Sequence, residues 1–218
     1  MTALHVPRGG WPSVDPADWQ TLMRLVRARV WSEDDARAAF LDLAQLAQDR
    51  VVVMTPSPAG PMVFVGPMGW QMQGRAPHTR MASEPHANLL YLRLACRHFG
   101  WPLLKEPAGF DRRFSGTLDR MGHILVDGRE ARLLARVSGG GYHPKTVRDV
   151  FRFVHSTLFA DRTPLVVVVP DVTRLRGRVP NHDLLILREY RVTPPVMDSS
   201  GPDAAVCATL RPQGEFDV

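Results

Sequence analysis

The chain has 218 residues, a length that suits one large domain or two small ones. Apolar residues make up 44% and charged residues 22%, and this usage excludes a disordered or fibrous chain. No stretch of 18 uninterrupted apolar residues occurs and no export signal is visible, so we expect no membrane partner and a cytoplasmic location. Two cysteines are too few for a disulfide framework or a four-thiolate zinc site, and we expect no cofactor.

The charge balance is more informative. The formal net charge is +5 and the sequence pI is about 9.9. Only Lys105 and Lys145 are lysines, and every other basic residue is an arginine. A GC-rich genome with solvated arginines is one explanation. The other is a phosphate-binding surface, because guanidinium groups match phosphate oxygens and a high pI is typical of nucleic-acid binding. We therefore expect double-stranded DNA as the leading partner.

Residues 1–15 are rich in proline and glycine and read as a flexible arm. Apolar residues then recur at helical spacing from Pro16 to Val30. Ser32 is a candidate N-cap for a second helical stretch that ends near Gln48. The strands expected next are Arg50–Thr55 and Met62–Val65, joined by a turn-rich loop, and a further helical turn is expected between Gly69 and Gly74.

The order helix, helix, β-hairpin predicts a winged-helix-like module over residues 16–75, which would place a helix in the DNA major groove and a wing on the backbone. Two features argue against sequence-specific contacts between this module and DNA. The stretch Ser32–Gln48 is short for two helices, and Leu41–Asp49 is acidic, which suits a polyanion poorly. The alternative is a protein–protein adaptor or dimerisation module, and a homodimer is one expected partner.

Residues 75–82 are polar and read as a linker to an α/β domain over 83–192, after which 193–218 form a polar tail. Helices are expected over His86–Phe99 and from Pro144 onward. The expected strands are Leu103–Glu106, Phe110–Phe114, His123–Val126, Ala131–Val137, Leu165–Val169 and Leu184–Leu187. The overall prediction is an α+β or α/β fold, with a mixed sheet flanked by helices.

The second half has the element order of the restriction-endonuclease-like fold. Active members hold Mg²⁺ with an Asp on one strand and a Glu-x-Lys on the next. Asp119 occupies the first place and is interpreted as a vestigial metal site, but Ala135 and Val137 stand where the second acid and the lysine are needed. We therefore expect no catalytic residue and no metal. A metal-dependent nuclease with displaced acids is a further alternative, its candidate ligands being Glu106, Asp111 and Glu130.

In the order of its elements and in its residue pattern, the chain resembles the replication-relaxation family of bacterial plasmid and mobile-element proteins. In that family a winged helix precedes a restriction-endonuclease-like domain. The stretches that carry the resemblance are Trp19–Val65, His86–Leu90, Gly100–Pro102, Leu118–Asp119, Ala131–Val137, Lys145–Val154 and Leu165–Val169. The resemblance implies DNA binding in replication or gene control. It does not imply cleavage, because the family's acidic positions are lost in this sequence.

The segment Gly139–Thr146 comes within one residue of a phosphate-binding P-loop, since Pro144 stands where the motif needs glycine. An NTPase is therefore disfavoured against a loop that turns the chain from strand into helix. An intermediate interpretation places a DNA phosphate at the helix N-terminus beside Lys145.

Nine basic residues are predicted to contact the nucleic-acid backbone. Lys145, Arg148 and Arg152 follow one another at i, i+3 and i+7 on one helix, opposite its apolar stripe. The others are Arg112, Arg113 and Arg120 near the predicted strands, and Arg174, Arg176 and Arg178 in a loop. The alternative for each group is a solvated surface or a charged guard of a sheet edge.

Overall fold

The computed structural model describes residues 10–75, 83–107, 121–157 and 162–192. It divides into two compact units, residues 1–90 and 91–218, and each is described here by itself. The predicted arm, linker and tail lie largely outside the described residues, as does the strand predicted over 110–114.

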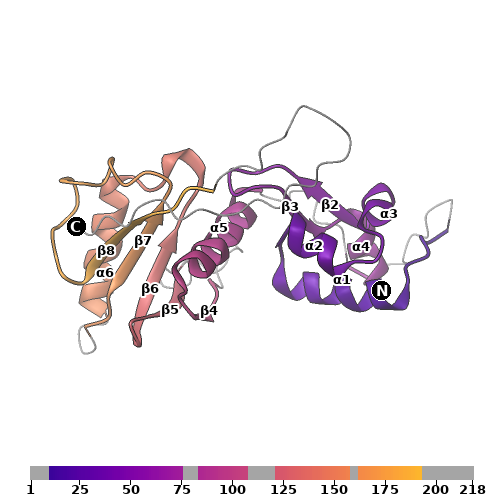
Figure 1. The fold of residues 1–218 in the computed structure, drawn as a ribbon, viewed down its shortest axis with the longest axis horizontal. Helices are drawn as coiled ribbons and strands as arrows, with labels where there is room; N and C mark the ends of the chain where they lie inside the picture. The colour runs from indigo at the N-terminus through magenta and orange to yellow at the C-terminus, as the bar shows by residue number, and fades with distance from the viewer. Residues whose placement is uncertain (1–9, 76–82, 108–120, 158–161, 193–218) are drawn as a thin grey trace. The chain divides into compact units, whose positions relative to one another are not determined.

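The first unit has the order helix, strand, helix, helix, strand, strand, helix (Figure 1). Its elements are α1 (Pro16–Ala28), β1 (Trp31–Ser32), α2 (Glu33–Ala39), α3 (Leu43–Gln48), β2 (Val52–Thr55), β3 (Met62–Val65) and α4 (Pro67–Met72). The three strands form an antiparallel sheet in the order β1-β3-β2. The described part of this unit therefore contains four helices and a three-stranded sheet, and the winged-helix-like module stays a prediction.

The helix predicted between Ser32 and Gln48 is in fact two helices, α2 and α3. Ser32 caps the first as expected, since its hydroxyl accepts a hydrogen bond from the Asp35 N–H at 3.1 Å. The chain then becomes extended at Phe40. Asp42 caps α3 by accepting from the Gln45 N–H at 2.9 Å. The single-helix prediction was wrong because a 3.6-residue periodicity persists across a break that local capping stabilises.

The second unit contains a five-stranded mixed sheet in the order β4-β5-β6-β7-β8. Its elements are α5 (Ser83–Phe99, beginning in the first unit), β4 (Leu103–Lys105), β5 (Gly122–Val126), β6 (Arg129–Ala135), α6 (Pro144–Thr157), β7 (Leu165–Val169) and β8 (Leu185–Glu189), with a 3₁₀ turn at Ser138–Gly140 before α6. Strands β4, β5 and β6 are antiparallel, whereas β6, β7 and β8 are parallel. The mixed α+β architecture predicted from the sequence is therefore confirmed.

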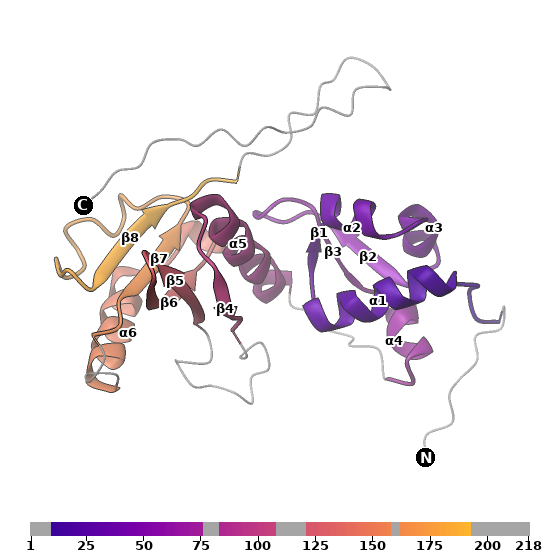
Figure 2. The ribbon, with the colours of Figure 1, turned by 60° about the horizontal axis from the view of Figure 1, so that its bottom comes forward.

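Helices α5 and α6 cover opposite faces of this sheet (Figures 1 and 2). On one face, Leu134 of β6 and Val167 of β7 are paired neighbours and pack in one cluster with Phe151 of α6. On the other face, a Cβ added to Gly122 would lie 3.2 Å from Leu92 of α5. Burial on both faces explains why all five residues of β7 are buried and apolar.

Candidate nucleic-acid interface

The positive charge of the chain belongs to its second half. Residues 16–75 carry six arginines and six acidic residues, so this segment is formally neutral. Residues 83–192 carry 18 basic and 11 acidic residues. A polyanion is therefore attracted mainly to the segment that contains the five-stranded sheet.

The first part of the candidate interface is the outer side of α6. Val147, Phe151 and Val154 are buried against the sheet, which fixes the rotation of the helix about its axis. Lys145, Arg148 and Arg152 are all exposed. At 100° per residue these three positions fall within one narrow arc, so α6 presents them as a single basic line.

The second part is the loop between β7 and β8. Because these strands are parallel, the chain must return along the sheet between their ends. Val172 and Leu175 are buried in the apolar cluster that also contains Val147 and Phe151 of α6. The same cluster thus anchors the loop and α6 on one face of the sheet. The exposed residues of the loop include Arg174, Arg176 and Arg178.

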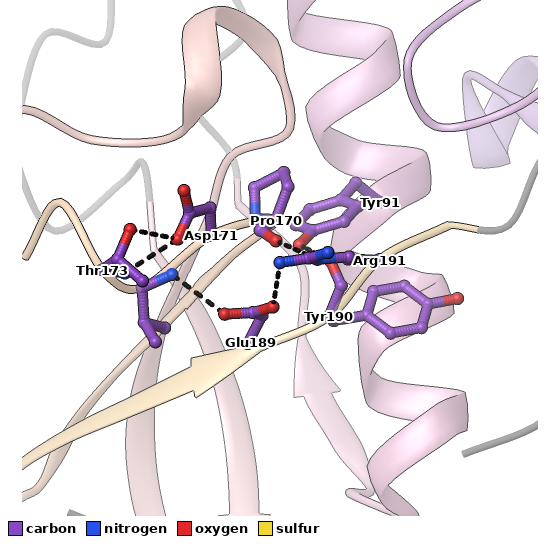
Figure 3. A network of polar contacts seen from close by, with 8 residues as sticks. Tyr91, Pro170, Asp171, Thr173, Glu189, Tyr190 and Arg191 are labelled. Atoms are coloured by element: carbon purple, nitrogen blue, oxygen red, sulfur yellow. Dashed lines mark hydrogen bonds and ion pairs between the residues drawn. The ribbon is translucent and has the colours of Figure 1, made fainter. Parts of the chain in front are cut away.

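A polar network holds the start of this loop, as Figure 3 shows. The Asp171 carboxylate accepts from the N–H and the hydroxyl of Thr173, at 2.8 and 2.6 Å. These two hydrogen bonds lower the pKa of Asp171, and nearby Arg191 and Arg174 lower it further. The Glu189 carboxylate accepts from the backbone N–H that follows Asp171, at 3.2 Å, and forms an ion pair with Arg191 at 2.7 Å. The two carboxylates therefore fix the start of the loop that carries the three arginines.

We call Lys145, Arg148, Arg152, Arg174, Arg176 and Arg178 together the basic surface. None of the six forms an ion pair with another residue that the structure describes. Arg93 differs, because the Glu106 carboxylate holds it with two hydrogen bonds of 2.6 and 2.9 Å. The one acidic residue within the basic line of α6 is Asp149, which is also exposed. The charge of the basic surface is therefore largely available to an external anion.

The glycine-rich segment before α6 has a packing role. Gly141 has φ +98°, and a Cβ added to it would lie 2.7 Å from the Val169 side chain of β7. At the helix N-terminus, His143 Nδ1 accepts from the Lys145 N–H at 3.2 Å, so one N–H group already has a partner within the chain. These contacts favour a strand-to-helix turn rather than a nucleotide-binding loop. The Lys145 side chain is exposed beside this turn.

Four of the predicted site residues lie outside the described residues: Arg112, Arg113, Arg120 and the vestigial metal ligand Asp119. The alternative acid Asp111 lies there too, so the nuclease hypothesis stays a prediction. Ala135 and Val137, in the places of the missing acid and lysine, are both buried. Within the described parts of the chain, no cluster of three His, Cys, Asp or Glu residues is placed to hold a metal ion.

The exposed residues of α3 and of the β2–β3 loop, with which a winged helix would touch DNA, include no cation, and the nearest exposed arginine is Arg50, after the C-cap of α3. The exposed residues of α3 are Ala44, Gln45 and Gln48. The two acidic residues of the stretch Leu41–Asp49 are the caps of α3, Asp42 at its N-terminus and Asp49 at its C-terminus. The side-chain amide of Gln45 donates a hydrogen bond to the Asp49 carboxylate at 2.9 Å. The β2–β3 loop has no charged residue, and Ser57 stabilises it by hydrogen bonds with Ala59 and Gly60. DNA contact through this module would therefore have little electrostatic support.

Comparison of the chain with family models, with curated proteins and with solved structures yields no match, so the resemblance to the replication-relaxation family stays a prediction. Among the helices that the structure describes, none is both long and apolar enough to cross a membrane.

Two polar contacts that shape these elements do not follow from the spacing of residues in the sequence. Asp18 is 3% exposed and accepts from the backbone N–H of Leu41 at 2.7 Å, which fixes the turn before α3. His155 and His182 lie together, with ring centroids 5.0 Å apart. The partners are 23 and 27 residues apart in the chain, so only the tertiary fold brings them together. A polar residue on the apolar side of α1 was the one available signal for Asp18.

Proposed function

We propose that this protein is a non-enzymatic DNA-binding protein whose basic surface holds the phosphate backbone of double-stranded DNA. The observation that carries the proposal is that six exposed cations, without ion-pair partners among the described residues, lie on two elements whose buried residues share one apolar cluster against the five-stranded sheet. These elements are α6 and the β7–β8 loop. Cations arranged in this way release counterions when they neutralise phosphates, and this release drives binding that does not depend on sequence. A role in replication, repair or transcription control agrees with such binding.

The test is a titration of fluorescent duplex DNA with the full chain at two salt concentrations, about 50 and 200 mM. We expect an affinity that falls steeply between them and that is similar for unrelated sequences. Absence of binding at the lower salt concentration would overturn the proposal. Cutting of the duplex that depends on Mg²⁺ and is lost in Asp119→Ala would instead establish the nuclease alternative.

A second candidate function concerns the first unit alone, which we propose contacts protein. The observation in its favour is the neutral surface of α3 and of the β2–β3 loop, together with Leu41, which is 74% exposed beside α3. Light scattering after size-exclusion chromatography distinguishes a homodimer from a monomer. If the chain is a dimer, Leu41→Asp is expected to shift it toward the monomer, and an unchanged dimer would exclude this surface as the self-interface.

A further inference from the structure

A pocket of about 560 Å³ opens where α6 ends and the parallel strands β7 and β8 begin. Its volume lies within the range of small-molecule sites. Among the residues that the structure describes, the polar ones that line it are His155, Arg162, Thr163, His182 and Asp183. None of these belongs to the basic surface, and the proposed function does not use them.

Phe151 of α6 positions the two histidines of the pocket. Its ring centroid lies 4.2 Å from that of His155 and 5.3 Å from that of His182. His182 Nδ1 accepts from the Leu184 N–H at 3.1 Å, which in the neutral ring leaves the proton on Nε2 as a donor. Burial, and to a lesser degree His182, lowers the pKa of His155, so this ring is neutral near pH 7.

The lining offers several hydrogen-bond donors to an anion with several acceptor oxygens. Arg162 is exposed and forms no ion pair with any residue that the structure describes. Thr163 adds a hydroxyl, and Asp183 is the one carboxylate among the described lining residues. A guanidinium group, a hydroxyl and imidazole N–H groups together are the donors that bind phosphate oxygens. An uncharged apolar ligand would leave these donors unsatisfied.

We propose that this pocket binds a phosphate monoester, held by Arg162 and Thr163 and contacted by the imidazoles of His155 and His182. The pocket is larger than phosphate alone, so a nucleoside can accompany the phosphate. Two sources share this chemistry: a free mononucleotide and the phosphorylated end of a nucleic-acid strand. The site is separate from the basic surface and does not depend on the proposed DNA binding.

The test uses the full chain and inorganic phosphate as the probe, at pH 7 and constant ionic strength. The imidazole signals of His155 and His182 are followed by NMR. We expect saturable shifts with a dissociation constant of about 1 mM, a value typical of a small anion held by few groups. Absence of a saturable shift, or equal shifts in every histidine of the chain, would overturn the proposal.

Two variants and one control sharpen this test. Arg162→Gln removes the charge and is expected to weaken phosphate binding about tenfold or more. His182→Asn removes the ring donor but keeps an oxygen that can accept from the Leu184 N–H, so the local turn is preserved and binding weakens. Arg50→Gln is the matched control, since both arginines are exposed and have positive φ, 59° for Arg50 and 47° for Arg162. Equal affinity in Arg162→Gln and the control would contradict the assignment.

The source of the phosphate is decided by comparing adenosine 5′-monophosphate with duplexes that carry a 5′-phosphate or a 5′-hydroxyl group. A preference for the phosphorylated duplex, lost in Arg162→Gln, identifies the strand end as the ligand. Binding of the mononucleotide with no preference between the duplexes identifies the free nucleotide. Failure of the basic surface to bind DNA would leave the phosphate titration unaffected, so the two proposals fail independently.

Discussion

Removal of two charges from α6 is expected to change the salt dependence of DNA binding by a predictable amount. If all six cations of the basic surface contact phosphates, the slope of log affinity against log salt is about −5. Lys145→Ala combined with Arg148→Ala would reduce it to about −3.5. The affinity loss between 50 and 200 mM salt would then fall from about 10³-fold to about 10²-fold.

The assay is fluorescence anisotropy with two unrelated duplexes, each measured over a range of salt concentrations. The matched control is Arg24→Ala with Arg27→Ala, which removes the same charge from two exposed positions of α1. We expect the control to keep the original slope, because net charge alone does not place a cation at a phosphate. An equal reduction of the slope in the control, or a different change for each duplex, would refute the reasoning.

Asp149 provides a test of opposite sign on the same helix. It is exposed four residues after Lys145 and three before Arg152. Asp149→Asn removes a carboxylate from the basic line and is expected to strengthen DNA binding a few-fold at low salt, with a smaller gain at high salt. The same anisotropy assay measures this change. Weaker binding in this variant would show that the exposed side of α6 does not face the nucleic acid.

Three further predictions concern stability and are measured by urea unfolding. Asp18→Ala should lower the free energy of unfolding by about 1–3 kcal/mol, because it leaves the N–H groups of the turn before α3 without their acceptor. Asp18→Asn keeps an oxygen acceptor and should cost less. Equal costs for the two variants would argue against these hydrogen bonds. Gly141→Ala should lower the free energy of unfolding by about 2–4 kcal/mol, because the residue has a positive φ and the new Cβ would contact Val169. Gly139 also has a positive φ, but a Cβ there contacts nothing, so Gly139→Ala should cost about 1 kcal/mol. Because the pKa of His155 is lowered in the folded chain, the unfolded chain takes up the proton first as the pH falls. The free energy of unfolding should therefore decrease below about pH 6.5. His155→Gln should reduce this decrease, and an unchanged decrease would contradict the role of His155.

Local sequence patterns were sufficient to predict most helices and strands. Met62–Val65 has the predicted bounds, and Leu165–Val169 is the buried strand that its continuous apolar run predicted. The side of α6 that is buried also follows from spacing, because Val147, Phe151 and Val154 recur with the helical period. These properties depend on residues within one or two turns of each other.

The break between α2 and α3 and the arrangement of the candidate site required the tertiary structure. The helical periodicity of apolar residues continued through Phe40, although the chain is extended there. The turn before α3 is held by a hydrogen bond from the Leu41 N–H to Asp18, which lies more than 20 residues earlier in the chain. The sequence shows three arginines in the β7–β8 loop but does not show where they lie in the fold. Burial of Leu175 in the cluster of α6 places the loop segment that carries them on the same face of the sheet as α6. Sequence patterns thus determine which side of an element is apolar, whereas contacts between distant segments decide which polar side chains meet, because those contacts depend on packing rather than on local period.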